Sequence, residues 1–454
     1  MKKILWLTIV ALCTGCSLKL RDAQVELPTE YIYGSDSGLR NSSTPISDTW
    51  WESFADPTLN ELMIIALRQN HDLAAAAAAV EASRHYLKVA RAEFLPSVDM
   101  EAIAEITHEE KATSQEYTIA PYLEWEVSLF GALRNTKRSA IASLMQEEWT
   151  LKGVWLSLST EVATSYFTLL QYQRSHHIAK RSYELRRTAT ALVDSMYRYG
   201  MSNGTDLMQA KSLVYSAKIE MQKYERAVAT ASLSLNTLLG NTPRTVDWSD
   251  TGAALIGDEL PINIPIGLPS SLLERRPDVM KSYYAMQKAG AQVGISRAAR
   301  YPTITLTGSG GVFATSLEGL TSGNPLLWSA TGELIAPLFS WGSLRRKELI
   351  ARQEYEASVQ EYEQSILEAL SDVEKALITI STYSSETAAT TALVLANSKI
   401  AQNSTALYRS GLGDYLSVID AERELYSSQI SLVEIVAQQY INYIDLFKAL
   451  GGGW

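Results

Sequence analysis

The sequence predicts a mainly helical protein that also carries membrane β-strands and contains two copies of one unit. The first observation is a set of short motifs that occurs twice in the same order, about 210 residues apart. The second is that each copy places two alternating segments before a very long helical pattern. This period is too long for a solenoid repeat, so we expect two substantial modules packed about a pseudo-symmetry axis. The clearest repeated motif is Tyr197-Arg198-x-Gly200, which recurs as Tyr408-Arg409-x-Gly411 at an offset of 411 − 200 = 211.

Residues 1–15 have the features of a signal peptide. Two lysines precede an apolar run from Ile4 to Leu12, which is too short to cross a bilayer as a stable helix. The run ends in Leu12-Cys13-Thr14-Gly15-Cys16, which resembles a bacterial lipoprotein signal box and predicts cleavage before a lipidated Cys16. The box normally has Leu where this chain has Cys13, and an ordinary signal peptide with two incidental cysteines is the alternative. Lipidation would leave the mature chain without a thiol for a disulfide.

Charge and composition exclude several classes of function. The formal net charge is −10, and loss of Lys2 and Lys3 with the signal makes it −12. An acidic chain without a basic cluster is a poor nucleic-acid binder. A hydrophobic content of 46% excludes a wholly disordered chain. No later segment approaches 18 consecutive apolar residues, so no transmembrane helix is expected.

The elements follow one another in a definite order. An arm precedes Asp56-Pro57, where Asp suits a helix N-cap and Pro the first turn. Pro96 ends the first helical region. The predicted parts are a lipid-anchored arm (16–56), helices (57–94), strands (95–130) and long helices (131–240), then a Pro- and Gly-rich linker (241–269), helices (270–301), strands (302–339), and long helices with the C-terminus (340–454).

The strand segments alternate with period two. In the first, Val98, Met100 and Ala102 share one face. Asp99, Glu101 and Glu105 share the opposite face. Regularly spaced acidic residues do not suit a soluble sheet packed on a core. They are typical of a membrane barrel with lipid outside and water inside.

The long helical patterns span 134–199 and 345–410, roughly 100 Å each at the α-helical rise. Glycines then turn the chain back. Apolar and small residues on the returning helices follow steps of three and four, which predicts a coiled coil. In the first copy these positions are Leu207, Ala210, Val214, Ala217, Met221, Tyr224, Val228, Ala231, Leu235 and Leu238.

Four strands alone make an open sheet with two exposed edges. Unpaired backbone groups at such edges cannot face lipid. A barrel must therefore close by sharing strands between chains, so the membrane interpretation requires self-association.

Four segments of the sequence are distinctive: Leu268–Val279, Gly294–Pro302, Tyr415–Arg423 and Ala449–Trp454. Together they resemble the TolC-like outer-membrane efflux channels, in the lipoprotein branch that serves drug and metal efflux pumps. The resemblance covers essentially the whole mature chain. It implies a homotrimer with a twelve-stranded β-barrel in outer-membrane lipid, continued by a twelve-helix coiled-coil tunnel that tapers to a closed periplasmic tip. It also implies a periplasmic adaptor and an inner-membrane pump as partners, and drugs or toxic small molecules as cargo.

The resemblance also assigns roles near the tip. Leu416 and Asp420 resemble the inward-facing constriction, where leucines resist wetting and carboxylates attract cations. Tyr408 and Arg409 resemble groups that tie the inner helix pair to the outer pair, with Thr205 and Asp206 as partners. The turns expected to face the adaptor comprise Gly200, Met201, Ser202, Asn203, Gly204, Gly411, Leu412, Gly413 and Asp414.

Other interpretations of these residues stay open. Judged by spacing alone, Tyr408 and Arg409 only pack and snorkel, and Asp420 is a solvated coiled-coil position. The adjacent His176 and His177 point about 100° apart on a helix, so no metal site is expected. No nucleophile–base arrangement or cofactor motif is present, so an enzyme is not expected. A protein-secretion channel or a non-conducting envelope lipoprotein are the alternative functions.

Overall fold

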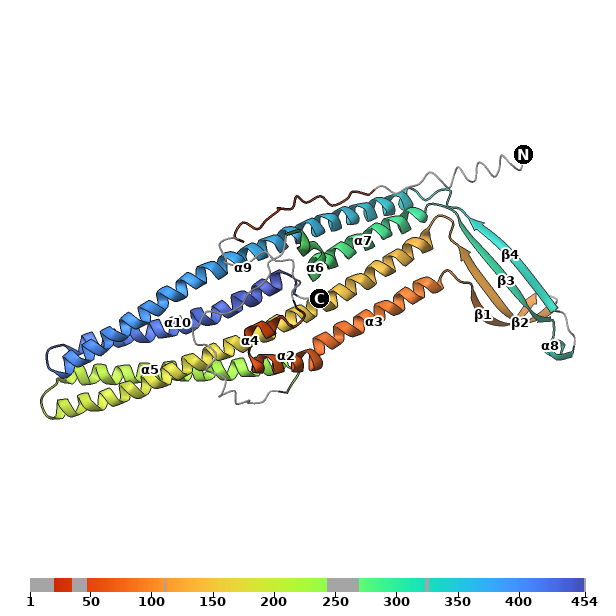
Figure 1. Ribbon diagram of the computed structural model, residues 1–454. Coiled ribbons are helices and arrows are strands. Elements are labelled where there is room, and N and C mark those ends of the chain that lie inside the picture. The colour runs from red at the N-terminus through yellow and green to blue at the C-terminus, as the bar shows by residue number, and fades with distance from the viewer. Residues whose placement is uncertain (1–19, 35–46, 110–111, 243–268, 323–325, 453–454) are drawn as a thin grey trace. The chain divides into compact units, whose positions relative to one another are not determined.

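The computed structural model describes residues 20–34, 47–109, 112–242, 269–322 and 326–452 (Figure 1). The predicted signal peptide, Cys16 and most of the predicted linker 241–269 lie outside the described residues. Among the described helices, none is long and apolar enough to cross a membrane.

The two copies repeat the same order of elements, as the duplicated motifs predict. The first copy runs α2 (Pro57–Gln69), α3 (His71–Ala92), β1 (Ser97–Glu109), β2 (Ala112–Val127), α4 (Ala132–Arg198) and α5 (Gly204–Leu238). The second runs α6 (Leu272–Arg275), α7 (Pro277–Ala298), β3 (Thr303–Ala314), β4 (Leu326–Ile335), α9 (Ser343–Arg409) and α10 (Tyr415–Ala449). Short elements are η1 (Trp50–Phe54), η2 (Pro269–Ser271) and α8 (Gly319–Ser322).

The first of two structural units comprises residues 1–25, 78–150 and 280–365, and contains the sheet. Its four strands are antiparallel in the order β1-β2-β3-β4, so β1 and β4 are the edges. The register puts Met100 opposite Pro121 on one face, and Glu105 opposite Glu116 on the other. The predicted alternation of an apolar and an acidic face is therefore present. Described residues of these strands include no Lys or Arg.

Gly311 in β3 lies where two neighbouring strands approach closely. A Cβ atom at this position would lie 2.2 Å from the carbonyl oxygen of Ile119 and 2.5 Å from the Cα of Ala120. The close approach of β2 and β3 therefore excludes a side chain.

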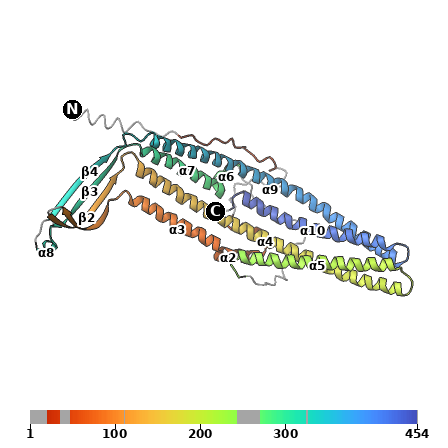
Figure 2. The same cartoon turned by 180° about the vertical axis from the view of Figure 1, so that it is seen from behind.

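The second unit comprises residues 26–77, 151–279 and 366–454. Its core includes an aromatic group: the ring of buried Trp50 lies 4.9 Å from that of Phe447, and the ring of Phe167 stacks 4.4 Å from that of Tyr440. In both views α5 returns beside α4 and α10 beside α9 (Figures 1 and 2). None of the ten predicted seam residues of α5 is exposed, which confirms that this face packs against neighbouring helices.

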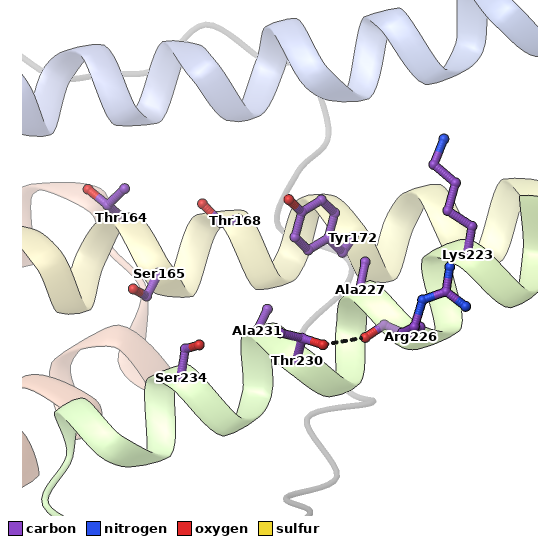
Figure 3. A pocket seen from close by; sticks show the side chains of 10 residues that line it. All are labelled: Thr164, Ser165, Thr168, Tyr172, Lys223, Arg226, Ala227, Thr230, Ala231 and Ser234. Atoms are coloured by element: carbon purple, nitrogen blue, oxygen red, sulfur yellow. Dashed lines mark hydrogen bonds between the residues drawn. The ribbon is translucent and has the colours of Figure 1, made fainter.

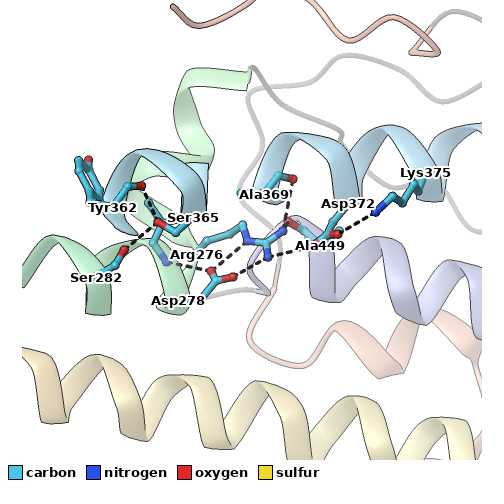
Figure 4. A network of polar contacts seen from close by, with 10 residues as sticks. Arg276, Asp278, Ser282, Tyr362, Ser365, Ala369, Asp372, Lys375 and Ala449 are labelled. Carbon is cyan, nitrogen blue, oxygen red and sulfur yellow. Dashed lines mark hydrogen bonds and ion pairs between the residues drawn. The ribbon is translucent and has the colours of Figure 1, made fainter. Parts of the chain in front are cut away.

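Arg276 joins three elements of the second unit (Figure 4). Its buried guanidinium donates to both carboxylate oxygens of Asp278, at 3.0 and 2.6 Å, and to Asp372 at 3.1 Å. It also donates to the carbonyl oxygens of Ala369 and Ala449, at 3.3 and 3.1 Å. The carbonyl of Ala449 belongs to the last turn of α10, so a cation caps the negative end of that helix.

The first copy has a neutral counterpart of this joint. Asn70 lies between α2 and α3 as Arg276 lies between α6 and α7, with similar backbone angles (φ −67°, ψ 129° against φ −73°, ψ 123°). Its amide donates to the carbonyl of Leu238 at the end of α5, at 3.0 Å. In both copies, therefore, the residue between two helices caps the C-terminus of the returning coiled-coil helix.

Candidate gate and partner-contact turns

The two turns that reverse the long helices have the same backbone design. Gly200 follows α4 with φ 72°, and Gly411 follows α9 with φ 74°. The N–H of Gly200 donates to Tyr197 O at 3.0 Å, and that of Met201 to Met196 O at 2.8 Å. Both bonds of this Schellman cap recur at the second turn, where Gly411 and Leu412 are the donors. The repeated Tyr-Arg-x-Gly motif therefore encodes a helix C-cap, because only glycine readily adopts this positive φ.

The helices that leave the turns begin with side-chain caps. Asn203 accepts a hydrogen bond from the N–H of Asp206 at 2.9 Å, and Asp414 accepts one from the N–H of Ser417 at 2.6 Å. Hydrogen bonds from the backbone N–H and the side chain of Ser417 hold the pKa of the Asp414 carboxyl below its ordinary value. Each turn is therefore capped on both sides and is a defined structure.

The predicted contact turns present apolar side chains to solvent. Met201 is 65% exposed and Leu412 is 79% exposed. Neither has a role in a described core cluster, so neither is explained by folding of the single chain. The remaining predicted turn residues are Gly200, Ser202, Asn203, Gly204, Gly411, Gly413 and Asp414, all exposed or half-buried.

Leu416 and Asp420 share one face of α10, four residues apart. Leu416 is 56% exposed, and the Asp420 side chain is 58% exposed. The opposite face, with Tyr415, Val418 and Ile419, is buried in a cluster with Leu207 and Ala210. Neither predicted gate residue is thus part of the chain's own core. Arg423 lies beside them, with a guanidinium nitrogen 3.5 Å from Asp420.

The predicted tie between helix pairs is not formed by hydrogen bonds within the described part of the chain. Asp206 accepts from the hydroxyl of Ser202 at 3.0 Å, and Thr205 is exposed. Tyr408 packs against the cluster that contains Leu207, with its ring 5.0 Å from that of Tyr415. Arg409 is exposed and makes no ion pair with a described residue. Apolar packing therefore joins Tyr408 of α9 to the cluster that contains Leu207 of α5.

A polar contact that the sequence analysis missed does join the two copies near the turns. Arg186 of α4 and Glu422 of α10 form an ion pair, with 3.9 Å between Nε and Oε2. No motif marks either residue, because each is one charged position on a long helical pattern. Only the packing of α4 on α10 brings them together.

A groove of about 550 Å³ lies between α4 and α5, away from the turns (Figure 3). Thr164, Thr168 and Tyr172 line it from α4, and Lys223 and Arg226 from α5. It has no carboxylate and no metal-ligand set. Among the described residues as a whole, no group of three or more His, Cys, Asp or Glu side chains could hold a metal ion.

The sheet, paired long helices and capped turns together define a TolC-like outer-membrane channel fold. The solved outer-membrane channel OprN has the same fold, with a TM-score of 0.87 and 25% identity over 97% of this chain and 99% of that one. Sequence comparison gives the same class. The model of the outer membrane efflux protein family matches residues 62–241 and 268–452, and the chain belongs to this family.

Two relatives illustrate the range of the family. The chain is 30% identical over 456 residues to the solvent efflux pump outer membrane protein SrpC of Pseudomonas putida, covering 97% of this chain and 96% of SrpC. It is also 30% identical over 463 residues to the probable outer membrane lipoprotein SilC of Salmonella typhimurium, covering 100% and 99%. The chain is therefore an efflux channel protein of the outer membrane, and its family is one of transport proteins.

Proposed function

We propose that three copies of this chain form one gated conduit, which receives small molecules from an inner-membrane pump through a periplasmic adaptor and releases them outside the cell. The observation that carries the proposal is the exposed Leu416–Asp420 face of α10, whose opposite face is buried. The solvent efflux named for SrpC supports apolar small molecules as cargo. The lipoprotein name of SilC supports a lipid anchor at Cys16.

The open sheet supports the assembly. Four antiparallel strands leave β1 and β4 as edges, and unpaired edges cannot lie in lipid. Pairing β1 of one copy with β4 of the next removes both edges in a closed ring. Three copies supply twelve strands, with the acidic face toward water inside and the apolar face toward lipid.

In this assembly the gate is a ring of Leu416 and a ring of Asp420. Three leucines around a narrow pore resist wetting, and three nearby carboxylates attract cations and repel anions. Divalent cations at the periplasmic side therefore block the pore. Arg423 competes for the same carboxylate at 3.5 Å, although an exposed pair of this kind is weak. Removing Arg423 therefore strengthens the block, whereas removing Asp420 relieves it.

Tyr408, Arg409, Thr205 and Asp206 keep their proposed role as the contacts that close the tip. The packing of Tyr408 on the cluster with Leu207 supports this role for the tyrosine. Arg409 is exposed and therefore available to a neighbouring copy. Phe at position 408 should preserve much of this packing, because the Tyr408 hydroxyl has no hydrogen-bond partner in the described residues.

The turns at 200–204 and 411–414 form the adaptor contact. An exposed apolar residue on each capped turn suits docking onto an apolar hairpin end. The combined substitutions Met201→Asp and Leu412→Asp test this, because both side chains are exposed and their loss should leave the fold intact. We expect efflux of a dye such as ethidium from whole cells to fall to the level of a strain without the chain.

Two measurements make this experiment specific. Conductance of the purified double variant in planar bilayers should equal that of wild type, since the pore is unchanged. Leu395→Asp, on the exposed surface of α9, is the control and should keep efflux. Normal dye efflux by the double variant would exclude these turns as the contact. Loss of protein export with normal dye efflux in the deletion strain would favour a secretion channel instead.

A further inference from the structure

The junctions between helices and strands in the two sequence copies correspond residue by residue. The long helices α4 and α9 each contain 67 residues and begin at 132 and 343, an offset of 343 − 132 = 211. The shorter helices α3 and α7 each contain 22 residues and begin at 71 and 277, an offset of 277 − 71 = 206. A glycine with positive φ directly precedes each long helix, at 82° and 76°. Trp341 is therefore the counterpart of Phe130, and Tyr301 that of Leu95.

Within one chain, two of these junctions contact each other. Strand β2 of the first copy pairs with β3 of the second, and their register ends with Val127 opposite Ile304. Just beyond that end, the ring of Phe130 stacks on the ring of Tyr301, with 4.8 Å between the ring centres and 13° between the planes. An aromatic contact therefore joins the two copies where their neighbouring strands meet the helices.

The counterparts of this pair lie at the two edges of the sheet and are open to solvent. Trp341 follows edge strand β4 and is 87% exposed, and Leu95 precedes edge strand β1 and is 69% exposed. Phe339, whose ring centre lies 4.8 Å from that of Trp341, is also exposed. Both edges therefore present apolar surface that the described part of a single chain does not bury.

The backbone at Trp341 gives a second reason to expect a role for its ring. Its φ is 51°, in the left-handed region that residues other than glycine rarely adopt. Glycine or asparagine would fit this conformation more readily. Strain of this kind is typical of positions that have a function, and burial within the described part of a single chain does not account for the large side chain.

We propose that Trp341 of one copy packs on Leu95 of the partner subunit, and that this contact repeats between chains what Phe130 and Tyr301 do within a chain. The inference rests on the proposed three-copy assembly, in which β4 of one copy pairs with β1 of the next. A rotation that carries β2 and β3 onto this pair of strands also carries the two junctions onto each other. Three contacts within chains and three between chains then close one apolar ring where the strands meet the helices.

Cysteine cross-linking of the full chain, purified from membranes in detergent, tests the contact. Beyond Cys13 and Cys16 the sequence has no cysteine, so the introduced thiols are readily distinguished. Leu95→Cys combined with Trp341→Cys, treated with a short bismaleimide, should move most of the protein to the masses of two and three chains in denaturing gels. Each single variant should stay at the mass of one chain. Leu95→Cys with Leu317→Cys is the control and should not cross-link, because exposed Leu317 lies beyond the far end of β3.

Substitutions at the same two positions supply a second readout, the temperature at which the assembly dissociates in SDS. Leu95→Tyr copies the aromatic pair found within the chain and should raise this temperature. Trp341→Asn removes the ring, suits the left-handed backbone and should lower the temperature. In the Trp341→Asn background, Leu95→Tyr should have no effect, because both substitutions act on one contact.

The outcomes separate failure of this inference from failure of the proposed assembly. A native mass of three chains without cross-linked dimers and trimers, or with a link inside one chain, would overturn the inference and leave the assembly in place. A Trp341 ring that faces lipid would give this result, together with an unchanged dissociation temperature in Trp341→Asn. A native mass of one chain would instead reject the three-copy assembly itself.

Discussion

Arg276→Ala is expected to destabilise the second structural unit strongly, because this one side chain joins α7, α9 and α10. All of its guanidinium nitrogens are used: two carboxylates and two carbonyl oxygens accept from it. Lysine cannot replace this planar fork of donors, so Arg276→Lys should recover little of the loss.

The decrease in the free energy of unfolding follows from what happens to each hydrogen-bond partner when the guanidinium is removed. The Asp278 and Asp372 side chains are 55% and 44% exposed, so water can hydrate them and their contribution is small. The carbonyls of Ala369 and Ala449 lose buried donors, at about 1–3 kcal/mol each. We therefore expect Arg276→Ala to lower the free energy of unfolding by about 3 kcal/mol, near the lower end for breaking a buried ion pair.

Urea unfolding of detergent-solubilised protein, followed by tryptophan fluorescence, measures this change. Buried Trp50 and Trp51 belong to the core of the same unit and report its unfolding. Lys375→Ala is the matched control, because Lys375 is exposed and lies 3.8 Å from the same Asp372 carboxylate. The free energy of unfolding of this control should fall by less than about 1 kcal/mol. If Arg276→Ala were as mild as the control, the assignment of Arg276 as the central joint would be wrong.

Three further predictions concern the anchor, the assembly and pH. Mass spectrometry of the mature N-terminus should find a diacylglyceryl-modified, acylated Cys16; cleavage elsewhere with an unmodified thiol would contradict the signal-box interpretation. The protein part of the solubilised assembly should have a mass of three times the 50.1 kDa chain, less three signal peptides, whereas a stable monomer with intact strands would exclude a shared barrel. Acidification should raise the free energy of unfolding through Glu422: burial raises the pKa of its carboxyl, so the folded chain binds a proton there more tightly than the unfolded chain and gains stability as the pH falls through that raised pKa. Arg186 faces Glu422 from α4, and Tyr415, Arg423 and Tyr426 are its charged or titratable neighbours on α10. In urea unfolding at several pH values, this contribution should be absent in Glu422→Gln, and a loss of stability on acidification that depends on Glu422 would contradict this sign.

The sequence predicts the elements well where a local pattern determines them. The long helices were expected at 134–199 and 345–410 and are observed at Ala132–Arg198 and Ser343–Arg409. Absence of proline, a strong helical pattern and a glycine at the turn suffice for this. The alternation in β1 likewise predicts which side chains share a face.

Contacts between distant helices could not be predicted in the same way. Arg186 and Glu422 are separated by 236 residues (422 − 186), and neither lies in a recognisable motif. Their contact depends on how α10 rotates against α4, which periodicity does not specify. Arg276 lies within the distinctive Leu268–Val279 segment, yet its bond to the carbonyl of Ala449 follows only from the fold. Leu416 and Asp420 could be selected by resemblance, whereas their exposure against a buried opposite face required the structure.

Single-channel recording of wild type and Asp420→Ala in planar bilayers tests the central claim, a cation-attracting gate at the start of α10. Wild type should be cation-selective and blocked by divalent cations added at the periplasmic side. Asp420→Ala should lose the block and shift away from cation selectivity, and Arg423→Gln should be blocked at lower divalent concentration. The same conductance, selectivity and block in all three proteins would show that the gate lies elsewhere.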